Sequence, residues 1–102
     1  MAVTSSKPSA LFPDLPTIAA TLPGYESVSS NGVFAPAKTP AAIINRLNQE
    51  IVRFLSQPDV RQKFFDAGTE TVGSSPNQLA VWMKGDMARM GKVIKDAGIR
   101  GE

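Results

Sequence analysis

The feature that most constrains this fold is a run of apolar residues at helical spacing between positions 40 and 55. These residues are Ile43, Ile44, Leu47, Ile51, Phe54 and Leu55. Their recurrence at three- and four-residue intervals predicts an amphipathic helix with one apolar face. Thr39 suits the N-cap and Pro40 the first helical position, and Pro58 requires the helix to end just before it. A helix of this kind needs another element to cover its apolar face.

Two further helices are expected downstream. One starts at Pro58 and ends at Gly68, because proline fits a first turn and glycine favours a C-cap. The other covers 76–97, where Ser75 and Gln78 form a capping box. Its apolar stripe comprises Leu79, Trp82, Met83, Met87, Met90, Val93 or Ile94, and Ala97. Such a stripe is typical of a core-facing helix, and its methionines also fit an adaptable partner surface.

Strand signals are fewer and shorter than helix signals. The best candidate is 25–35, and 2–4 and 69–72 are weaker candidates, while 14–20 has the pattern of a short helix. We therefore predict an α/β fold in which the helices pack on a small sheet. Such a sheet leaves open edges, so the chain has the pattern of an α/β structure whose other strands are missing. Open edges also predict self-association into a homo-oligomer.

Composition and charge exclude several classes of function. The 102 residues contain neither His nor Cys, which removes disulfides, cysteine-based zinc sites and the usual nucleophile–base pairs. We therefore expect no enzyme, no bound metal and no cofactor. The 11 Lys and Arg are interspersed with 9 Asp and Glu, for a formal charge of +2, without the basic and aromatic stripe that marks nucleic-acid binding. The apolar runs fall far short of the ~20 residues of a membrane span, and no secretory signal is visible.

The polar centre of the 25–35 segment is the best candidate for ligand binding. Ser29, Ser30 and Asn31 offer hydroxyl and amide groups, and Gly32 next to them is conformationally permissive. These groups suit hydrogen bonding to a small carboxylate or amide. A solvated edge strand has the same pattern, so the residues alone leave both interpretations open.

Several short motifs, taken in their order along the chain, resemble one protein family. They are Pro-Asp-Leu-Pro-Thr-Ile-Ala at 13–19, Leu-Pro-Gly-Tyr-Glu at 22–26, Gly-Val-Phe-Ala-Pro-Ala-Lys-Thr-Pro at 32–40, Leu-Asn-Gln-Glu-Ile at 47–51, Pro-Asp-Val-Arg at 58–61 and Gly-Lys-Val-Ile-Lys-Asp-Ala-Gly-Ile at 91–99. Each motif is weak alone. Together they look like the C-terminal part of the substrate-binding proteins of tripartite tricarboxylate transporters, which are extracytoplasmic solute receptors of the Bordetella-uptake-gene type.

The resemblance implies both a fold and a function. It implies a partial lobe of a type II periplasmic-binding-protein-like fold, with 1–102 as a single domain that forms the C-terminal fragment of a two-lobe receptor. It also implies a periplasmic receptor that captures a small carboxylate solute and delivers it to membrane permease subunits, without catalysis. Ser29, Ser30 and Asn31 are then the candidate ligand-binding residues. The alternative is a truncated chain that binds no solute and acts only as a self-associating module.

Overall fold

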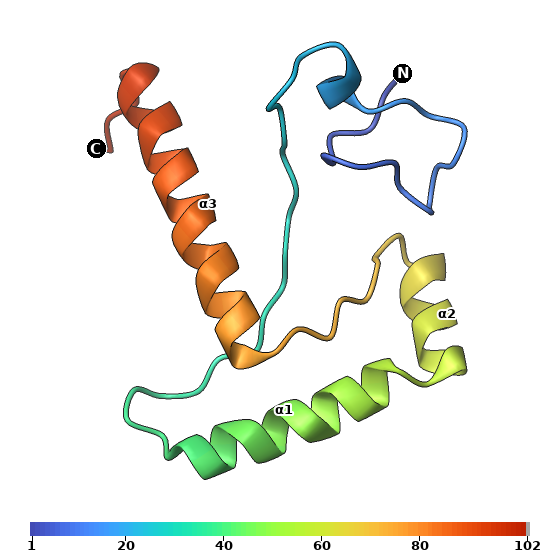
Figure 1. The fold of residues 1–102 in the computed structure, drawn as a ribbon, viewed down its shortest axis with the longest axis vertical. Coiled ribbons are helices and arrows are strands. Elements are labelled where there is room, and N and C mark those ends of the chain that lie inside the picture. The colour runs from blue at the N-terminus through green and yellow to red at the C-terminus, as the bar shows by residue number, and fades with distance from the viewer. Residues whose placement is uncertain (102) are drawn as a thin grey trace. The chain divides into compact units, whose positions relative to one another are not determined.

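The computed structural model describes residues 1–101 (Figure 1). Its elements are the 3-10 turn η1 Ile18–Ala20 and the helices α1 Ala41–Leu55, α2 Pro58–Asp66 and α3 Pro76–Asp96. Contacts within the chain divide it into two compact units. Unit 1 comprises Met1–Phe34 with Gln57–Thr71, and unit 2 comprises Ala35–Ser56 with the chain from Val72 onward. The prediction that the whole chain is one domain remains a prediction.

Unit 2 is built from α1 and α3, which contact each other near the start of α3. The Asn48 side-chain amide in α1 donates a hydrogen bond of 2.9 Å to the Ser74 carbonyl oxygen, just before α3 begins. The predicted capping box is confirmed. The Gln78 backbone N–H donates to the Ser75 hydroxyl at 3.2 Å, and the Ser75 N–H donates to the Gln78 side-chain carbonyl at 2.9 Å. These bonds satisfy backbone groups that a helix start otherwise leaves unpaired.

The entry to α1 differs by one residue from the prediction. Pro40 is the N-cap and the helix begins at Ala41, while the Thr39 hydroxyl donates to the Pro36 carbonyl at 2.8 Å. The Thr39 N–H bonds the same carbonyl at 3.2 Å, which closes a tight turn. Lys38 in this turn has a φ of +69°, a conformation that favours glycine. The chain therefore enters α1 through a turn rather than through a side-chain cap.

Unit 1 contains α2 and a loop region in which isolated hydrogen bonds connect separate segments. Val3 forms an isolated parallel bridge with Thr17, with hydrogen bonds of 2.8 Å to the Pro16 carbonyl and 2.9 Å from the Ile18 N–H. Among the described residues, Val60 in α2 is the one buried hydrophobic side chain, at 6% exposure. The predicted stop at Gly68 fits the structure, since Gly68 follows α2 with a φ of +78°.

The predicted fold class is wrong, because residues 1–101 contain no strand and therefore no small sheet on which the helices could pack. A strand exists only when its backbone bonds to a neighbouring strand, and an isolated pair is marginal in water. The candidate strand at 2–4 is reduced to the single bridge of Val3. The candidate strand at 25–35 forms one backbone hydrogen bond with the 2–4 segment, from the Ser27 N–H to the Thr4 carbonyl at 2.9 Å. The candidate at 69–72 also forms no strand.

The predicted short helix at 14–20 is shortened to η1. The Thr17 hydroxyl, rather than Asp14, accepts the capping bond, from the Ala20 N–H at 3.2 Å. A cap at Thr17 leaves room for a single turn before the chain reverses at Gly24, whose φ is +85°. Separately, no helix within residues 1–101 has the length and apolar character needed to cross a membrane.

Candidate functional site

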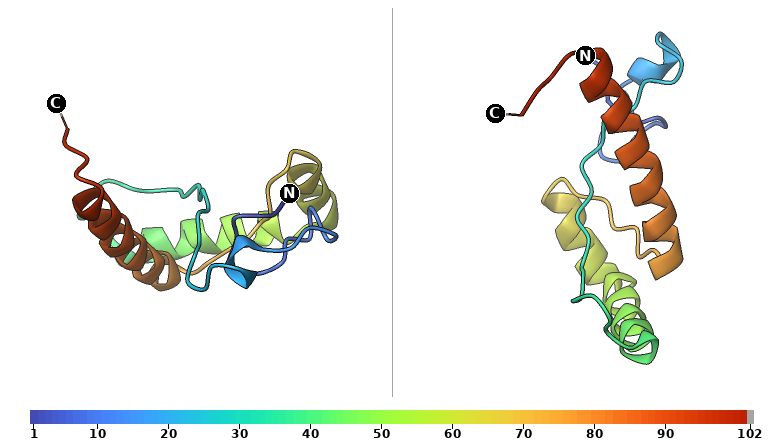
Figure 2. Two further views of the ribbon diagram at one scale, coloured as in Figure 1. Left: turned by 90° about the horizontal axis from the view of Figure 1, so that it is seen from above. Right: turned by 90° about the vertical axis from the view of Figure 1, so that its left-hand side faces the viewer.

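The candidate ligand-binding residues lie on the long segment that runs from η1 toward α1 without regular secondary structure (Figures 1 and 2). Two bonds fix its first part. The Tyr25 N–H donates to the Leu22 carbonyl at 3.1 Å, and the Ser27 N–H donates to the Thr4 carbonyl at 2.9 Å. From Val28 to Phe34, backbone groups form no backbone–backbone bonds within residues 1–101. The polar centre of the segment therefore begins immediately after a fixed point and keeps its own backbone groups available.

Ser29, Ser30 and Asn31 are all exposed to solvent. None of their side chains forms a hydrogen bond with another group in the described part of the chain. The serine hydroxyls and the asparagine amide can each donate a hydrogen bond to an anionic oxygen. Within the described residues, these side-chain donors are therefore free to bind a ligand.

Three ion pairs each lie within a single helix. Arg46 pairs with Glu50 at 2.9 Å in α1, Arg89 pairs with Asp86 at 2.5 Å in α3, and Lys92 pairs with Asp96 one turn later. Within residues 1–101 no three acidic, His or Cys side chains come close enough together to hold a metal ion. The three ion pairs join residues three or four positions apart, which is the usual spacing of ion pairs on a helix surface.

Sequence reasoning missed two features of the structure. The Ser9 hydroxyl donates to the Glu70 carboxylate at 2.8 Å, which joins parts of unit 1 that lie 61 residues apart. No local pattern signals such a contact, because it depends on how the chain folds back. The left-handed Lys38 was also missed, although the proline two residues before it is itself a turn signal.

Three comparisons place the chain among known proteins. The family model described as "Tripartite tricarboxylate transporter family receptor" matches residues 1–99. A UPF0065 protein from the tcbD-tcbE intergenic region of Pseudomonas sp. (strain P51) is 40% identical over 96 residues, which are 92% of this chain and 29% of that protein. A UPF0065 protein of Bordetella bronchiseptica is 31% identical over 100 residues, covering 98% of this chain and 30% of that protein.

A solved structure extends the similarity to the backbone. R. palustris Rpa4515, whose structure was determined with adipate, superimposes with a TM-score of 0.79 and 38% sequence identity, over 96% of this chain and 33% of that chain. The chain thus spans about a third of the length of each of these three proteins. The family resemblance seen in the sequence motifs is confirmed, because the family model covers nearly every residue. This chain belongs to the receptor family of the tripartite tricarboxylate transporters.

Proposed function

We propose that this chain is part of a periplasmic solute receptor that captures small carboxylates and delivers them to the membrane subunits of a tripartite transporter. The observation that carries the proposal is the similarity to Rpa4515, which was solved with adipate and shares 38% identity with this chain at a TM-score of 0.79. The two carboxylates are the polar groups of adipate, so a protein that selects it must recognise carboxylate oxygens. A receptor of this kind binds and releases its solute unchanged and needs no catalytic group.

The residues proposed to contact the solute are Ser29, Ser30 and Asn31. Their side chains are exposed, and they have no hydrogen-bond partner within the described residues. A hydrogen bond from a neutral donor to an ionised carboxylate is stronger than one between two neutral groups. We assign all three side chains a direct contact with a carboxylate oxygen of the solute.

The proposal is tested by thermal melting of the 102-residue chain with a panel of ligands. Adipate, other dicarboxylates and tricarboxylates form the panel, and adipamide, which has the same carbon skeleton without charge, is the control. A ligand that binds the folded form alone must raise the melting temperature. At a ligand concentration of a hundred times the Kd, the free energy of unfolding rises by about 2.7 kcal/mol. We expect a saturable rise with at least one carboxylate and none with adipamide. No rise with any carboxylate at millimolar concentration contradicts the proposal for this chain.

Matched variants then locate the contacts. Ser29→Ala and Asn31→Ala should each raise the apparent Kd for the carboxylate, obtained from the melting shift, by about tenfold or more. Each variant removes a hydrogen bond to a charged group, which is worth roughly 1.5–3 kcal/mol. Ser6→Ala is the control, because Ser6 is an exposed serine of the same unit that lies outside the segment. If Ser6→Ala and Ser29→Ala change the apparent Kd equally, the assignment of Ser29 to the binding site is wrong.

A second candidate function is self-association without a solute. The observation in its favour is the number of large apolar side chains that stay exposed, among them Val33 at 72%, Val72 at 84% and Met87 at 70%. Exposed apolar surface of this extent is typical of a chain that associates. Light scattering over a wide concentration range tests it. A monodisperse monomer at every concentration would contradict this candidate.

A further inference from the structure

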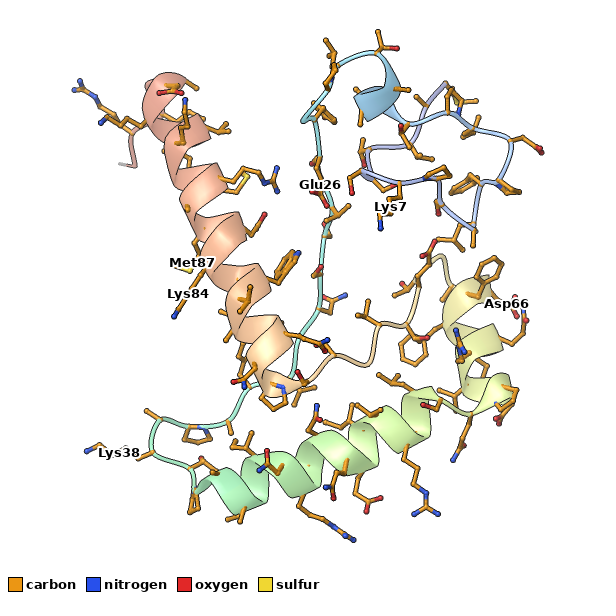
Figure 3. The ribbon with its side chains drawn as sticks, viewed as in Figure 1. Lys7, Glu26, Lys38, Asp66, Lys84 and Met87 are labelled. Carbon is orange, nitrogen blue, oxygen red and sulfur yellow. The ribbon has the colours of Figure 1, made fainter. Side chains whose placement is uncertain are left out.

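Asn31 differs from the other asparagines of the chain in its neighbour and in its surroundings. The asparagines are at positions 31, 45, 48 and 77, and of these Asn31 alone precedes a glycine. The other three lie inside α1 or α3. Asn31 lies between Glu26 and Lys38, which Figure 3 labels, in the segment without regular secondary structure. An asparagine followed by glycine is especially prone to attack by the next backbone nitrogen, because glycine has no Cβ to obstruct the approach.

The nucleophile in such an attack is the backbone nitrogen of Gly32. Its N–H donates to no acceptor within residues 1–101. An amide N–H that is held by a carbonyl oxygen is restrained from losing its proton and from turning toward a side chain. The described part of the chain places neither restraint on the Gly32 nitrogen. The nearest preceding backbone bond is the one from the Ser27 N–H to the Thr4 carbonyl, at 2.9 Å.

The group under attack is the side-chain amide carbon of Asn31, Cγ. This side chain is exposed and has no hydrogen-bond partner among the described residues. Rotation about its own bonds can therefore bring Cγ against the Gly32 nitrogen, and solvent water reaches both groups. Asn48 is the contrasting case, because its side-chain amide donates to the Ser74 carbonyl at 2.9 Å and its backbone lies within α1.

We propose that Asn31 is a site of spontaneous deamidation, which proceeds through a cyclic succinimide. Hydroxide removes the Gly32 amide proton, the nitrogen forms a bond to the Asn31 Cγ, and the Cγ–Nδ2 bond breaks. The side-chain nitrogen leaves as ammonia with a proton taken from water, which restores the hydroxide. Water then opens the ring: addition at Cγ gives aspartate, and addition at the backbone carbonyl carbon gives isoaspartate. The net reaction consumes one water, releases one ammonia and involves no oxidation or reduction.

The modification changes the charge of the candidate binding segment. It lowers the formal charge of the chain, which is +2, by one unit. The new carboxylate follows Ser29 and Ser30 directly in the chain. A solute that carries a carboxylate is repelled by a charge of the same sign, so the modified chain should bind it more weakly. This consequence rests on the proposed function, whereas the modification itself does not.

Peptide mapping by mass spectrometry tests the modification without any ligand. The 102-residue chain is held at mildly alkaline pH, and its tryptic peptides are analysed at intervals, with isoaspartyl methyltransferase labelling to detect isoaspartate. Trypsin cuts after Lys38 and Arg46, so Asn31 and Asn48 fall in different peptides. We expect Asn31 to be converted first, and faster as the pH rises, because the attacking nitrogen must be deprotonated. Gly32→Ala should slow the conversion at least about tenfold, because its Cβ obstructs the attack.

Gln49→Gly separates the contribution of the structure from that of the sequence. This variant creates a second Asn-Gly pair inside α1, where the N–H of residue 49 belongs to the helix ladder and Asn48 is held by Ser74. In one sample of the folded variant, Asn31 should convert at least about tenfold faster than Asn48. Glycine weakens a helix, so circular dichroism is used to verify that the helices persist. In guanidinium chloride, where they are lost, the two sites should convert at similar rates.

Several results would overturn the inference. One is an unmodified Asn31 while a peptide of residues 28–34 converts under the same conditions. Another is equal conversion of Asn31 and Asn48 in the folded Gln49→Gly variant, and a third is conversion of Asn31 in Gly32→Ala as fast as in the parent chain.

The effect on binding has a separate measurement. Asn31→Asp places the same charge without an altered backbone, and it should raise the apparent Kd for the carboxylate at least about tenfold. An unchanged Kd for Asn31→Asp contradicts the expected effect on binding. If the unmodified chain shows no melting shift with any carboxylate, the proposed function fails, while the mass measurement still decides whether Asn31 is deamidated.

Discussion

The two units of this chain hold their backbones in different ways. In unit 2, α1 and α3 form most of their hydrogen bonds between residues four apart, and one side-chain bond from Asn48 to Ser74 links them. In unit 1, beyond α2, the chain is held by single bonds between distant segments, such as Val3 with Pro16 and Ser9 with Glu70. A helix closes its own ladder, whereas an extended segment depends on a neighbour. Unit 1 is therefore the part that should fail first when a contact is lost.

The burial of apolar side chains differs between the units in the opposite way from backbone bonding. The buried side chain of the described residues, Val60, belongs to unit 1, while α1 and α3 contain no buried residue. Unit 1 thus combines the weaker backbone bonding with the better-covered apolar side chain. Unit 2 combines self-sufficient helices with open apolar faces. The difference predicts that substitutions in one unit leave the other largely intact.

The largest expected effect comes from Val60→Asp. The change would place a carboxylate without a partner in the position of a side chain that is 6% exposed. An uncompensated buried charge costs roughly 3–5 kcal/mol, which is enough to unfold a small unit. Amide resonances of unit 1 should collapse toward random-coil positions in a two-dimensional NMR spectrum, while those of α1 and α3 persist.

Arg61→Asp is the control for this change, since Arg61 is the exposed neighbour of Val60 in α2. It should leave the spectrum of unit 1 intact. If Val60→Asp instead melts both units together, the separation into two independently held parts is wrong.

A smaller effect is expected from Asn48→Ala. The change removes the 2.9 Å bond to the Ser74 carbonyl, and a bond of this type contributes about 1 kcal/mol. Alanine also favours the helix over asparagine by up to about 0.7 kcal/mol, which partly offsets the loss. Asn45→Ala, on the exposed side of α1, carries the same gain in propensity without the lost bond. The difference between the two variants in urea unfolding should therefore be about 1 kcal/mol. Equal stabilities would mean that the helices of unit 2 do not depend on this link.

The same contrast explains what the sequence could predict. The helix expected at 40–55 is observed as Ala41–Leu55, and that expected over 76–97 is observed as Pro76–Asp96. Both are encoded by periodicity and caps within the segment itself. The strand expected at 25–35 is not observed, because strand propensity cannot form a ladder without a partner strand. That other strands complete the fold stays a prediction.

The candidate site shows the same limit. Residue type indicated that Ser29, Ser30 and Asn31 could donate to a ligand, and the structure leaves them exposed. Which other groups would surround a solute is a non-local question that periodicity does not address. The bond between Ser9 and Glu70 illustrates this, since nothing near either residue in sequence indicates the other.

The smallest expected effect concerns the turn that leads into α1. Lys38 holds a φ of +69°, where a Cβ atom is unfavourable, and the Thr39 N–H and hydroxyl both bond to the Pro36 carbonyl around it. Lys38→Gly removes the steric cost of about 1–2 kcal/mol but adds freedom to the unfolded chain, which leaves a net gain of about 0.5–1 kcal/mol. Lys38→Ala keeps the Cβ and loses the same charge, so it should give no gain. Urea unfolding of the two variants separates these causes. Equal stability of both would show that the charge, and not the backbone conformation, governs this turn.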